Sequence, residues 1–516
     1  MRFARTLGVV TLAATLVGSS DVQARTINIG PAYSIKEVYD FAFQDLVAGD
    51  TVRIHHRNRP YRGVIRISGR GTKANRIKVI GVPGPDGQLP ILDGDGASTH
   101  PGDRYDTGNG QSDLVGSGIV TLTRGPGVAR GALVEWVVIE NLEIRNARSE
   151  PTAYRYFDYD GVERPWGNAS AGIYMLGARQ IIIRRCKIHD CANGVFFKTN
   201  DVNDRVERVL FDRNYIYNNA QDPTVDPTGD GANESHNVYG EGQYITYRGN
   251  RFGPTFRRRP GAALKSRSAG LVIENNWFEG SVRPSEENGN RLLDIVHAQD
   301  SYDYVINNHL NAYRNTQVLG NLIISGPGES VTAVHYGGDD DGAIPTYRRG
   351  NLWFQNNTVV KTGSRERNPT YFQDYHFVLF DIETDRETVN ATNNVFHSVK
   401  ASGQGIQNEP ILALTYTPGR LKLGPNWIRQ GYETVRNNVP PNVSKGNADN
   451  LIVGTNPRFN SLSNRNYVPA ANSPLIDVGV TPGTRYRKLR KQYVPHQKLK
   501  NRTVKGAARD LGAFER

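Results

Sequence analysis

Three side chains that could transfer protons stand at one fixed distance from a recurring asparagine motif. They are a phenol, an amine and an imidazole, each 11 residues before an asparagine: Tyr239 before Asn250, Lys265 before Asn276 and His297 before Asn308. The residue preceding each of the three is apolar. Because side chains alternate between the two faces of a strand, this spacing predicts that all three point outward from stacked strands of one sheet.

Further polar residues belong to the same region. Glu241, Arg267 and Gln299 lie two residues after the first three and therefore share their face. His236 and Asp294 lie three residues before the first row. This odd offset places them at the edge of the cluster only if the strand begins after them.

These residue types suit β-elimination of a polysaccharide that contains uronic acids. The reaction removes the proton at C5, stabilises an enolate-like carboxylate and protonates the leaving glycosidic oxygen. Lys265 can act as the base if Arg267 and a charged His297 lower the pKa of its amine. Arg267 or Arg291 can neutralise the substrate carboxylate.

A phenol or an imidazole can protonate the leaving oxygen, and three residues qualify: Tyr239, His236 and His297. With Lys265 and Arg267, these make up the expected catalytic group. Five other residues are expected to contact the substrate: Glu241, Arg291, Asp294, His335 and Tyr336.

The elements that must position these residues are short strands built on an Asn-Asn-aromatic or Asn-Asn-aliphatic motif. Between the last asparagines of neighbouring copies, the spacing is 36, 26, 32, 36 and 37 residues. Such self-similarity is typical of a solenoid. The copies are Glu140–Ile144, Arg213–Ile216, Gly249–Phe252, Glu274–Phe278, Ile306–Leu310, Gly320–Ile324, Gln355–Val359 and Thr392–Phe396, with Arg185–Ile188 as a copy that has Cys186 in the asparagine place.

Asparagine tolerates left-handed backbone at a tight corner, and its amide can bond to the asparagine of the next coil. The apolar residues that follow then point alternately inward and outward. A β-propeller would show evenly spaced blades, which the sequence lacks. The pattern predicts an all-β protein, a single-stranded parallel β-helix, with residues 25–516 as one domain.

Both ends of the chain carry recognisable segments. Residues 1–24 have a basic start and an apolar run of 11 residues, which is typical of a signal peptide and too short to span a bilayer. We therefore expect a secreted or periplasmic protein without a membrane span. Ser34–Leu46 has apolar residues at helical spacing and is the one helix expected after the signal peptide, within an N-terminal cap of residues 25–60.

Residues 450–516 are expected to close the solenoid. Asn472–Gly479 followed by Arg509–Glu515 resembles the closing segment common in bacterial right-handed parallel β-helix proteins. The resemblance implies a right-handed coil and says nothing about chemistry.

A second resemblance concerns chemistry. Ala263–Arg267, followed by Asn275 and Asn276, resembles the Lys-Ser strand of the chondroitinase-B and alginate-lyase family of β-helix lyases. In that family the lysine is the base, an arginine on the following coil assists, and calcium often neutralises the carboxylate. The resemblance implies that Lys265 is the base. The expected Arg-His-Gly is absent from the next coil, so the arginine's role passes to Arg267 or Arg291, or the mechanism differs.

The chain is basic, with a formal net charge of +12 and a pI near 9.5. This charge favours an acidic partner, although Arg257–Arg259 and Arg485–Arg490 could simply be solvated loops. Together with the lyase resemblance, it leads us to expect an acidic polysaccharide as partner, no nucleic acid, and a monomer.

One loop could bind a metal. Gly337–Gly342 contains Asp339, Asp340 and Asp341 among flexible glycines, and Ca²⁺ takes oxygen ligands of this kind. The spacing of an EF-hand is missing, so an exposed acidic turn is the alternative.

Aromatic and sulfur residues leave two questions open. Tyr154–Asp160 and Tyr371–His376 could stack on sugar rings or anchor loops. Cys186 and Cys191 could form one local bridge or remain two buried thiols.

Three other functions remain open beside the lyase. A glycoside hydrolase needs two carboxylates, and Glu241 with Asp294 are the only central pair. A C5-epimerase would share the lyase's proton abstraction. A non-catalytic glycan-binding β-helix would alter no substrate. The sequence lacks the Gly-x-Ser-x-Gly, phosphate-loop, Cys-x-x-Cys and His-Glu-x-x-His motifs, which disfavours a serine hydrolase, a nucleotide site and zinc.

Overall fold

The computed structural model describes residues 23–103, 116–125, 128–148, 154–167, 169–220, 235–255, 261–280, 290–326, 331–339, 344–362, 376–399, 411–415, 419–435 and 451–516. The predicted signal peptide lies outside these ranges except for its last two residues. Within them, no helix is long and apolar enough to cross a membrane.

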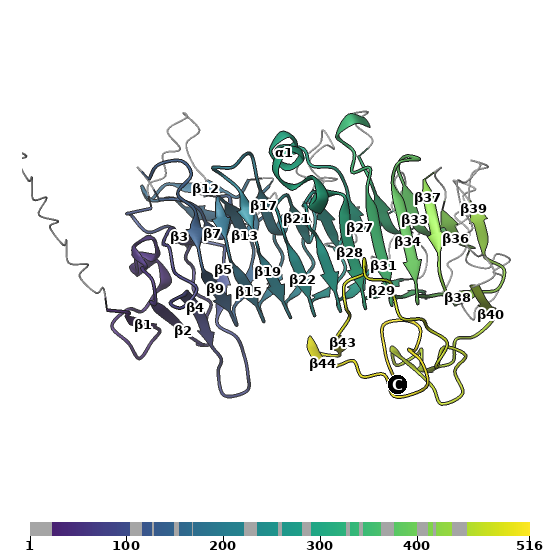
Figure 1. Ribbon diagram of the computed structural model, residues 1–516. Helices are drawn as coiled ribbons and strands as arrows, with labels where there is room; N and C mark the ends of the chain where they lie inside the picture. The colour runs from purple at the N-terminus through teal and green to yellow at the C-terminus, as the bar shows by residue number, and fades with distance from the viewer. Residues whose placement is uncertain are drawn as a thin grey trace, which may run out of the picture.

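The chain winds through three long sheets in turn, and every pairing between successive coils in these sheets is parallel (Figure 1). One coil consists of β22, β23 and β24, and the next consists of β25, β26 and β27, each strand pairing with its counterpart. The predicted all-β fold, a single-stranded parallel β-helix, is confirmed.

Sheet 1 contains twelve strands within the described residues: β1 (Thr26–Ile29), β2 (Thr51–His55), β4 (Ile77–Val82), β9 (Val137–Glu140), β15 (Ile182–Arg184), β19 (Leu210–Asp212), β22 (Thr246–Arg248), β25 (Val272–Glu274), β28 (Asn315–Leu319), β31 (Asn351–Gln355), β34 (Thr388–Thr392) and β37 (Arg420–Leu423).

Sheet 2 has eleven described strands: β5 (Ile91–Asp93), β10 (Glu143–Arg145), β16 (Lys187–His189), β20 (Tyr215–Tyr217), β23 (Arg251–Phe252), β26 (Trp277–Glu279), β29 (Leu322–Ser325), β32 (Thr358–Lys361), β35 (Val395–Ser398), β38 (Asn426–Arg429) and β40 (Leu451–Gly454).

Sheet 3, which carries the predicted catalytic residues, also has eleven described strands: β3 (Ile65–Ile67), β7 (Gly118–Leu122), β13 (Ala171–Leu176), β17 (Asn193–Lys198), β21 (Val238–Gly240), β24 (Leu264–Ser266), β27 (Asn290–Ile295), β30 (Val331–Tyr336), β33 (His376–Ile382), β36 (Ile411–Thr415) and β39 (Glu433–Val435).

The remaining elements are short. The minor strands are β6 (Ala97–Ser98), β8 (Val134–Glu135), β11 (Arg155–Phe157), β12 (Glu163–Pro165), β14 (Ala178–Arg179), β18 (Val206–Glu207), β41 (Phe459–Ser461), β42 (Asn466–Pro469), β43 (Lys491–Val494) and β44 (Lys498–Asn501). The helices are η1 (Val38–Asp40), η2 (Phe43–Asp45), α1 (Tyr302–Tyr313) and η4 (Ile344–Thr346).

A ladder of buried asparagines joins the coils at the corner between sheets 1 and 2. Each side-chain amide donates to the amide oxygen of the next asparagine over 2.9–3.1 Å, and that oxygen also accepts the backbone N–H of the first residue over 2.8–2.9 Å. The ladder comprises Asn214, Asn250, Asn276, Asn321, Asn357, Asn394 and Asn426.

The structure refines the predicted corner geometry. The left-handed residue is the one before each ladder asparagine from Asn214 to Asn394, for example Asn275 (φ 56°) and Asn393 (φ 57°), and the ladder asparagine itself is not left-handed. Cys186 occupies the ladder place one coil earlier, as the sequence predicted, and its N–H donates to Asn214 Oδ1. Cys186 and Cys191 are both buried free thiols.

One predicted copy of the motif is wrong. Asn308 lies in helix α1, and the ladder runs from Asn276 directly to Asn321 over 45 residues of sequence. The helix packs Val305 and Tyr313 against Ala269 and Ala298. A local Asn-Asn-His-Leu segment therefore resembles a rung in residue types, whereas the apolar spacing around it suits a helix.

The predicted helix Ser34–Leu46 is also wrong. The segment forms two short 3-10 turns, η1 and η2, with extended backbone at Phe41 between them. Its apolar residues Val38, Phe43 and Leu46 are nevertheless buried in the main core.

The C-terminal segment folds back along the outside of the solenoid (Figure 1, yellow). Phe514 and Tyr493 pack with Trp277 of sheet 2, and Leu511 packs with Trp427. The N–H of Ala513 donates to Thr358 Oγ1, so the end of the chain covers the outer face of sheet 2.

The ladder can be tested by comparing one of its members with the asparagine that lies in the helix. Asn276→Ala removes the acceptor of the buried Asn250 N–H, and an unsatisfied buried donor costs about 1–3 kcal/mol. We expect the free energy of unfolding to fall by about that amount in urea titrations. The matched control is Asn308→Ala, which alters an exposed helical side chain and should leave stability nearly unchanged. Equal effects would contradict the register.

Candidate active site on sheet 3

Five ionisable side chains form one outward-facing row across sheet 3. The strand register pairs Tyr239 with Lys265, Lys265 with Asp294, Asp294 with His335, and His335 with Asp381. The preceding residues, such as Leu264 and Leu293, are fully buried in the core. The predicted neighbours Tyr239 and Lys265 are therefore confirmed.

His297 does not stand in this row, contrary to the expectation. Because Asn308 is not a rung asparagine, counting back from it assigned the wrong residue, and Asp294 pairs with Lys265 instead. His297 follows the end of β27 and still borders the cluster. Its carbonyl accepts from Arg267 over 2.9 Å, and its Nδ1 accepts the Asp339 N–H over 3.1 Å.

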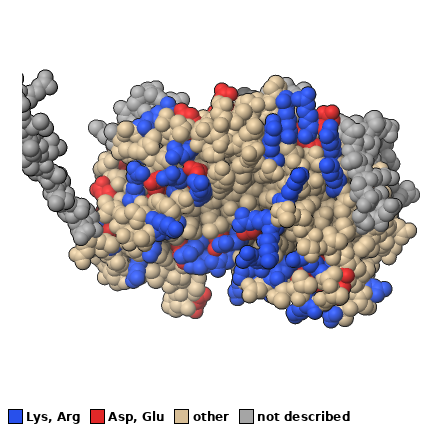
Figure 2. Space-filling view, in the orientation of Figure 1, with Lys and Arg blue, Asp and Glu red and all other residues tan. Residues whose placement is uncertain are grey.

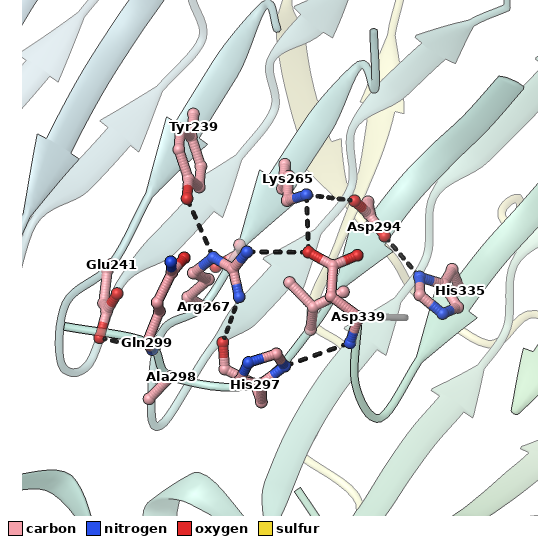
Figure 3. A network of polar contacts seen from close by, with 12 residues as sticks. Tyr239, Glu241, Lys265, Arg267, Asp294, His297, Ala298, Gln299, His335 and Asp339 are labelled. Atoms are coloured by element: carbon pink, nitrogen blue, oxygen red, sulfur yellow. Dashed lines mark hydrogen bonds and ion pairs between the residues drawn. The ribbon is translucent and has the colours of Figure 1, made fainter. Parts of the chain in front are cut away.

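Three cations converge on the carboxylate of Asp339, and Figure 3 shows two of them, Lys265 and Arg267. Asp339 Oδ2 lies 2.9 Å from Lys265 Nζ and 2.8 Å from Arg267 Nη2, and its Oδ1 lies 3.5 Å from Arg291 Nη1. Lys265 Nζ is also 3.4 Å from Asp294 Oδ2. Lys265, Arg291 and Asp339 are partly exposed, whereas Arg267 and Asp294 are buried.

The pKa of Lys265 moves opposite to the expectation. Burial alone would lower the pKa of the amine, but the charges of Asp294 and Asp339 outweigh burial and raise it. The expected lowering by a charged His297 does not arise, because His297 Nδ1 accepts a hydrogen bond from a backbone N–H. Lys265 is an ammonium at neutral pH in this arrangement.

His335 lies between two carboxylates and forms a hydrogen bond with each of them. Its Nδ1 is 2.6 Å from Asp294 Oδ1 and its Nε2 is 2.5 Å from Glu383 Oε1. Burial alone would lower the pKa of the imidazole, but the two carboxylates raise it to about 10. In turn, burial would raise the pKa of Asp294, but the bond from His335 and the charge of Lys265 hold it well below its usual range.

Two residues expected to contact the substrate, Tyr336 and Glu241, are buried and have structural roles instead. Tyr336 is fully buried in the hydrophobic core, because it follows His335 by one residue and so points to the opposite face. Glu241 is buried and accepts the N–H groups of Gln299 and Ser301 and the Ser301 hydroxyl. Its carboxylate thus stabilises the loop that starts helix α1.

His236 cannot serve as a cationic acid. It is buried, and its Nδ1 accepts the N–H of Ala262 over 2.9 Å. Burial, followed by the charge of Lys265, lowers the pKa of the ring to about 3. The imidazole is therefore neutral over the whole physiological range.

Tyr239 remains the accessible proton carrier. Its phenolic oxygen accepts from Arg267 Nε over 3.0 Å, and Lys265 Nζ lies 5.8 Å from its ring centroid. Burial raises the pKa of the phenol, against the lowering influence of Arg267 and Lys265. Tyr239 is partly exposed, so it can meet both a substrate and solvent.

A fully buried arginine fixes this cluster to the solenoid. Arg348 Nε donates to the carbonyl of Val296, and its Nη2 donates to that of Ser268. These carbonyls belong to the neighbours of His297 and Arg267, so one guanidinium ties two coils of the site together.

Sequence reasoning missed Asp381, Glu383 and Arg348 as parts of this network. A single acid among apolar residues in Phe377–Ile382 is a signal for an outward polar position in a strand. Arg348 follows no such pattern, and only the packing reveals its partners.

The described acids do not fit calcium. Two groups have ligand atoms within 4.8 Å of one another, Asp294 with His335 and Asp339, and His335 with Asp381 and Glu383. Calcium needs six to eight oxygens, but both groups include the imidazole nitrogens of His335 in place of an oxygen, and Asp339 already contacts three cations. Asp340 and Asp341 lie outside the described residues, so their predicted role as metal ligands stays untested.

Of the aromatic and basic loops singled out in the sequence, the structure describes Tyr154–Asp160 and Arg485–Arg490. Tyr156 is buried and packs on Trp166 at 4.6 Å between ring centroids, which supports an anchoring role for that loop. Residues 371–375 and 257–259 lie outside the described part of the chain.

No protein-family model and no curated protein matches the sequence. Among solved structures, the chain is similar to pectate lyase Pel9A (13% identity, 96% of this chain and 97% of that chain, TM-score 0.47). It is also similar to an alginate lyase from Paenibacillus sp. str. FPU-7 (14%, 73% and 94%, TM-score 0.41) and to a rhamnogalacturonan lyase (12%, 75% and 85%, TM-score 0.39). At these identities and TM-scores, the chemistry of this chain must be argued from its own residues.

The opposite protonation of the two buried histidines is directly measurable. We expect the ring nitrogen shifts of His335 to report an imidazolium at pH 8, and those of His236 to report a neutral ring, in ¹⁵N NMR assigned with His335→Gln and His236→Gln. A neutral His335 at pH 8 would contradict the arrangement in which its ring donates to both Asp294 and Glu383.

The raised pKa of His335 also predicts how the stability of the fold depends on pH. The folded-state pKa of His335 lies above its ordinary value of about 6.5. The stability from its protonated ring is therefore complete below about pH 6.5 and is lost as the pH rises towards about 10. Urea titrations across this range should show a loss that is smaller in His335→Gln.

Proposed function

We propose that the protein is an exported lyase that cleaves an acidic, uronate-containing polysaccharide by β-elimination. The observation that carries the proposal is the convergence of Lys265, Arg267 and Arg291 on one carboxylate beside the phenol of Tyr239. A uronate carboxylate is the substrate group that such a cluster would bind, and the C5 proton to be removed is adjacent to it.

The two arginines are suited to neutralising the substrate carboxylate. Guanidinium groups remain charged at every relevant pH and bind carboxylates through two N–H groups. Arg291 is partly exposed and can reach a bound sugar, whereas Arg267 is held from behind by the carbonyl of His297. Neutralising that carboxylate stabilises the enolate-like charge that develops when C5 loses its proton.

We assign Lys265 as the base that takes the C5 proton. Its ammonium must first lose a proton, which Asp294 and Asp339 oppose. If a substrate carboxylate replaces Asp339 on the arginines, Lys265 loses one of its two acidic neighbours. The positive charge of Arg267, which lowers the pKa of the amine, then favours its neutral form.

We assign Tyr239 as the donor to the leaving glycosidic oxygen. Arg267 Nε donates to the phenolic oxygen, which leaves the phenolic hydrogen available to another acceptor. His236 and His297 are no longer candidates as cationic acids, because Nδ1 of each ring accepts a backbone N–H.

Hydrolysis has weaker support. The central pair of acids, Glu241 and Asp294, is already engaged, the former by the N–H groups before α1 and the latter by His335 and Lys265. Neither resembles a free acid or base flanking a glycosidic bond. A C5-epimerase would use the same proton abstraction, so the product must distinguish it.

The deciding experiment is incubation with a panel of uronate polysaccharides, followed by the ultraviolet absorbance of an unsaturated product. Lys265→Ala should reduce the rate roughly 10²–10⁴-fold, as expected for loss of a general base. The matched control is Lys198→Ala, on strand β17 of the same sheet, two strands away from the strand that carries Lys265, and it should retain activity. New reducing ends without absorbance would indicate a hydrolase, an altered sugar configuration without cleavage an epimerase, and no change a binding protein.

The role of Asp339 gives a second prediction. Asp339→Asn removes one of the two charges that raise the pKa of Lys265. Because the base must be deprotonated, kcat/KM should rise with pH in the native enzyme, and this rise should move to lower pH in the variant. Asp300→Asn, an exposed acid at the start of α1, is the control. An unshifted pH profile in Asp339→Asn would exclude Lys265 as the titrating base.

A further inference from the structure

Residues 478–509, here called the basic strap, contain ten Lys and Arg and no Asp or Glu. The strap belongs to the C-terminal segment that folds back along the solenoid, and it includes the hairpin β43–β44. The proposed lyase chemistry uses none of its residues.

The strap is held against the solenoid by apolar contacts and hydrogen bonds. Leu489 packs on Val272 and Leu319 of sheet 1, and Tyr493 packs near Trp277 of sheet 2. Gln317 bonds to the backbone on both sides of Tyr486, accepting from one N–H and donating to one carbonyl, each over 3.0 Å. The strap therefore presents its charges from a fixed position.

Most of these charges are not neutralised by neighbouring acids. Arg487 lies 3.5 Å from Glu274, and the buried Arg502 lies 3.0 Å from Glu515. Across the described ranges, no other cation of the strap has a carboxylate oxygen within 4.0 Å. The exposed cations are Arg485, Arg487, Lys488, Arg490, Lys491, Lys498, Lys500 and Lys505.

The hairpin of the strap fixes the direction in which some of these cations point. In β44, Leu499 turns towards Gly249 of the solenoid, while Lys498 and Lys500 on either side of it are exposed. Figure 2 shows Lys and Arg side chains gathering in the region of β43 and β44. Because the strap covers sheets 1 and 2, this surface is separate from the candidate site on sheet 3.

We propose that the basic strap is a second binding surface for an acidic polysaccharide, which holds the polymer on the enzyme while another stretch of it occupies sheet 3. The choice of a polyuronate rests on the proposed function. A fixed surface with many closely spaced, uncompensated cations suits a polymer with repeated carboxylates. The tyrosines of the strap are covered, Tyr493 fully and Tyr486 in part, so the surface lacks an exposed aromatic platform for nucleic-acid bases.

The test compares two triple variants of the full chain, each in a Lys265→Ala background that prevents cleavage. The strap variant is Lys488→Gln/Lys498→Gln/Lys500→Gln. The control variant is Lys36→Gln/Lys73→Gln/Lys78→Gln, which removes three exposed lysines from the N-terminal coils. The probes are alginate and polygalacturonate, with neutral dextran as the blank, and the readout is Kd by calorimetry at low and high salt.

We expect the strap variant to bind the polyuronates about tenfold more weakly at low salt, because three exposed charge contacts are lost, and the control to bind as the parent does. The difference should shrink in high salt. Equal affinities of the two variants would overturn the proposal, as would tighter binding of duplex DNA or anionic vesicles than of either polyuronate. Because the experiment measures binding, it tests the strap whether or not the protein cleaves the polymer.

Discussion

Hydrogen bonds between asparagines of successive coils fix the register on which everything else depends. The amide oxygen of each ladder asparagine after the first accepts two hydrogen bonds from the asparagine of the preceding coil, one from its side-chain amide and one from its backbone N–H. Sliding one coil past the next would leave these buried donors unsatisfied. In a stacked sheet, a shift by one residue also reverses which side chains face outward. The ladder at the corner of sheets 1 and 2 thereby determines which residues meet on sheet 3, although it contacts none of them.

Along the outer face of sheet 3, charges are brought together because each coil contributes one residue to a single row. Strands about 4.8 Å apart force neighbouring side chains into contact, so the row persists only if opposite charges alternate or share protons. Lys265 beside Asp294, and His335 between Asp294 and Asp381, meet that condition within the row, and Asp339 and Glu383 add carboxylates from outside it. The cost of burying these groups falls when each has a charged partner. The same pairing keeps Lys265 protonated until a substrate carboxylate changes its surroundings.

Insertions between the strands adapt this repetitive frame. Helix α1 lengthens one coil to 45 residues between ladder asparagines, and Glu241 from two coils earlier accepts the N–H groups at its start. The loop that follows β30 brings the carboxylate of Asp339 onto sheet 3, and buried Arg348 holds the backbone beneath it. The C-terminal segment lies on a different face, where it covers apolar side chains of sheets 1 and 2 and exposes a group of cations.

The residue pattern alone determined the parallel β-helix, the asparagine corners and the pairing of Tyr239 with Lys265, because these depend on local spacing that repeats from coil to coil. The same spacing failed where a helix interrupts the repeat, so His297 was placed in the row that Asp294 occupies. It also predicted a helix at residues 34–46 from apolar spacing that two 3-10 turns satisfy equally well. Only the tertiary structure decided the charge states and the partners of His335, Glu241 and Asp339. Burial and contacts between residues 40 to 75 positions apart set those properties, and no local pattern encodes them.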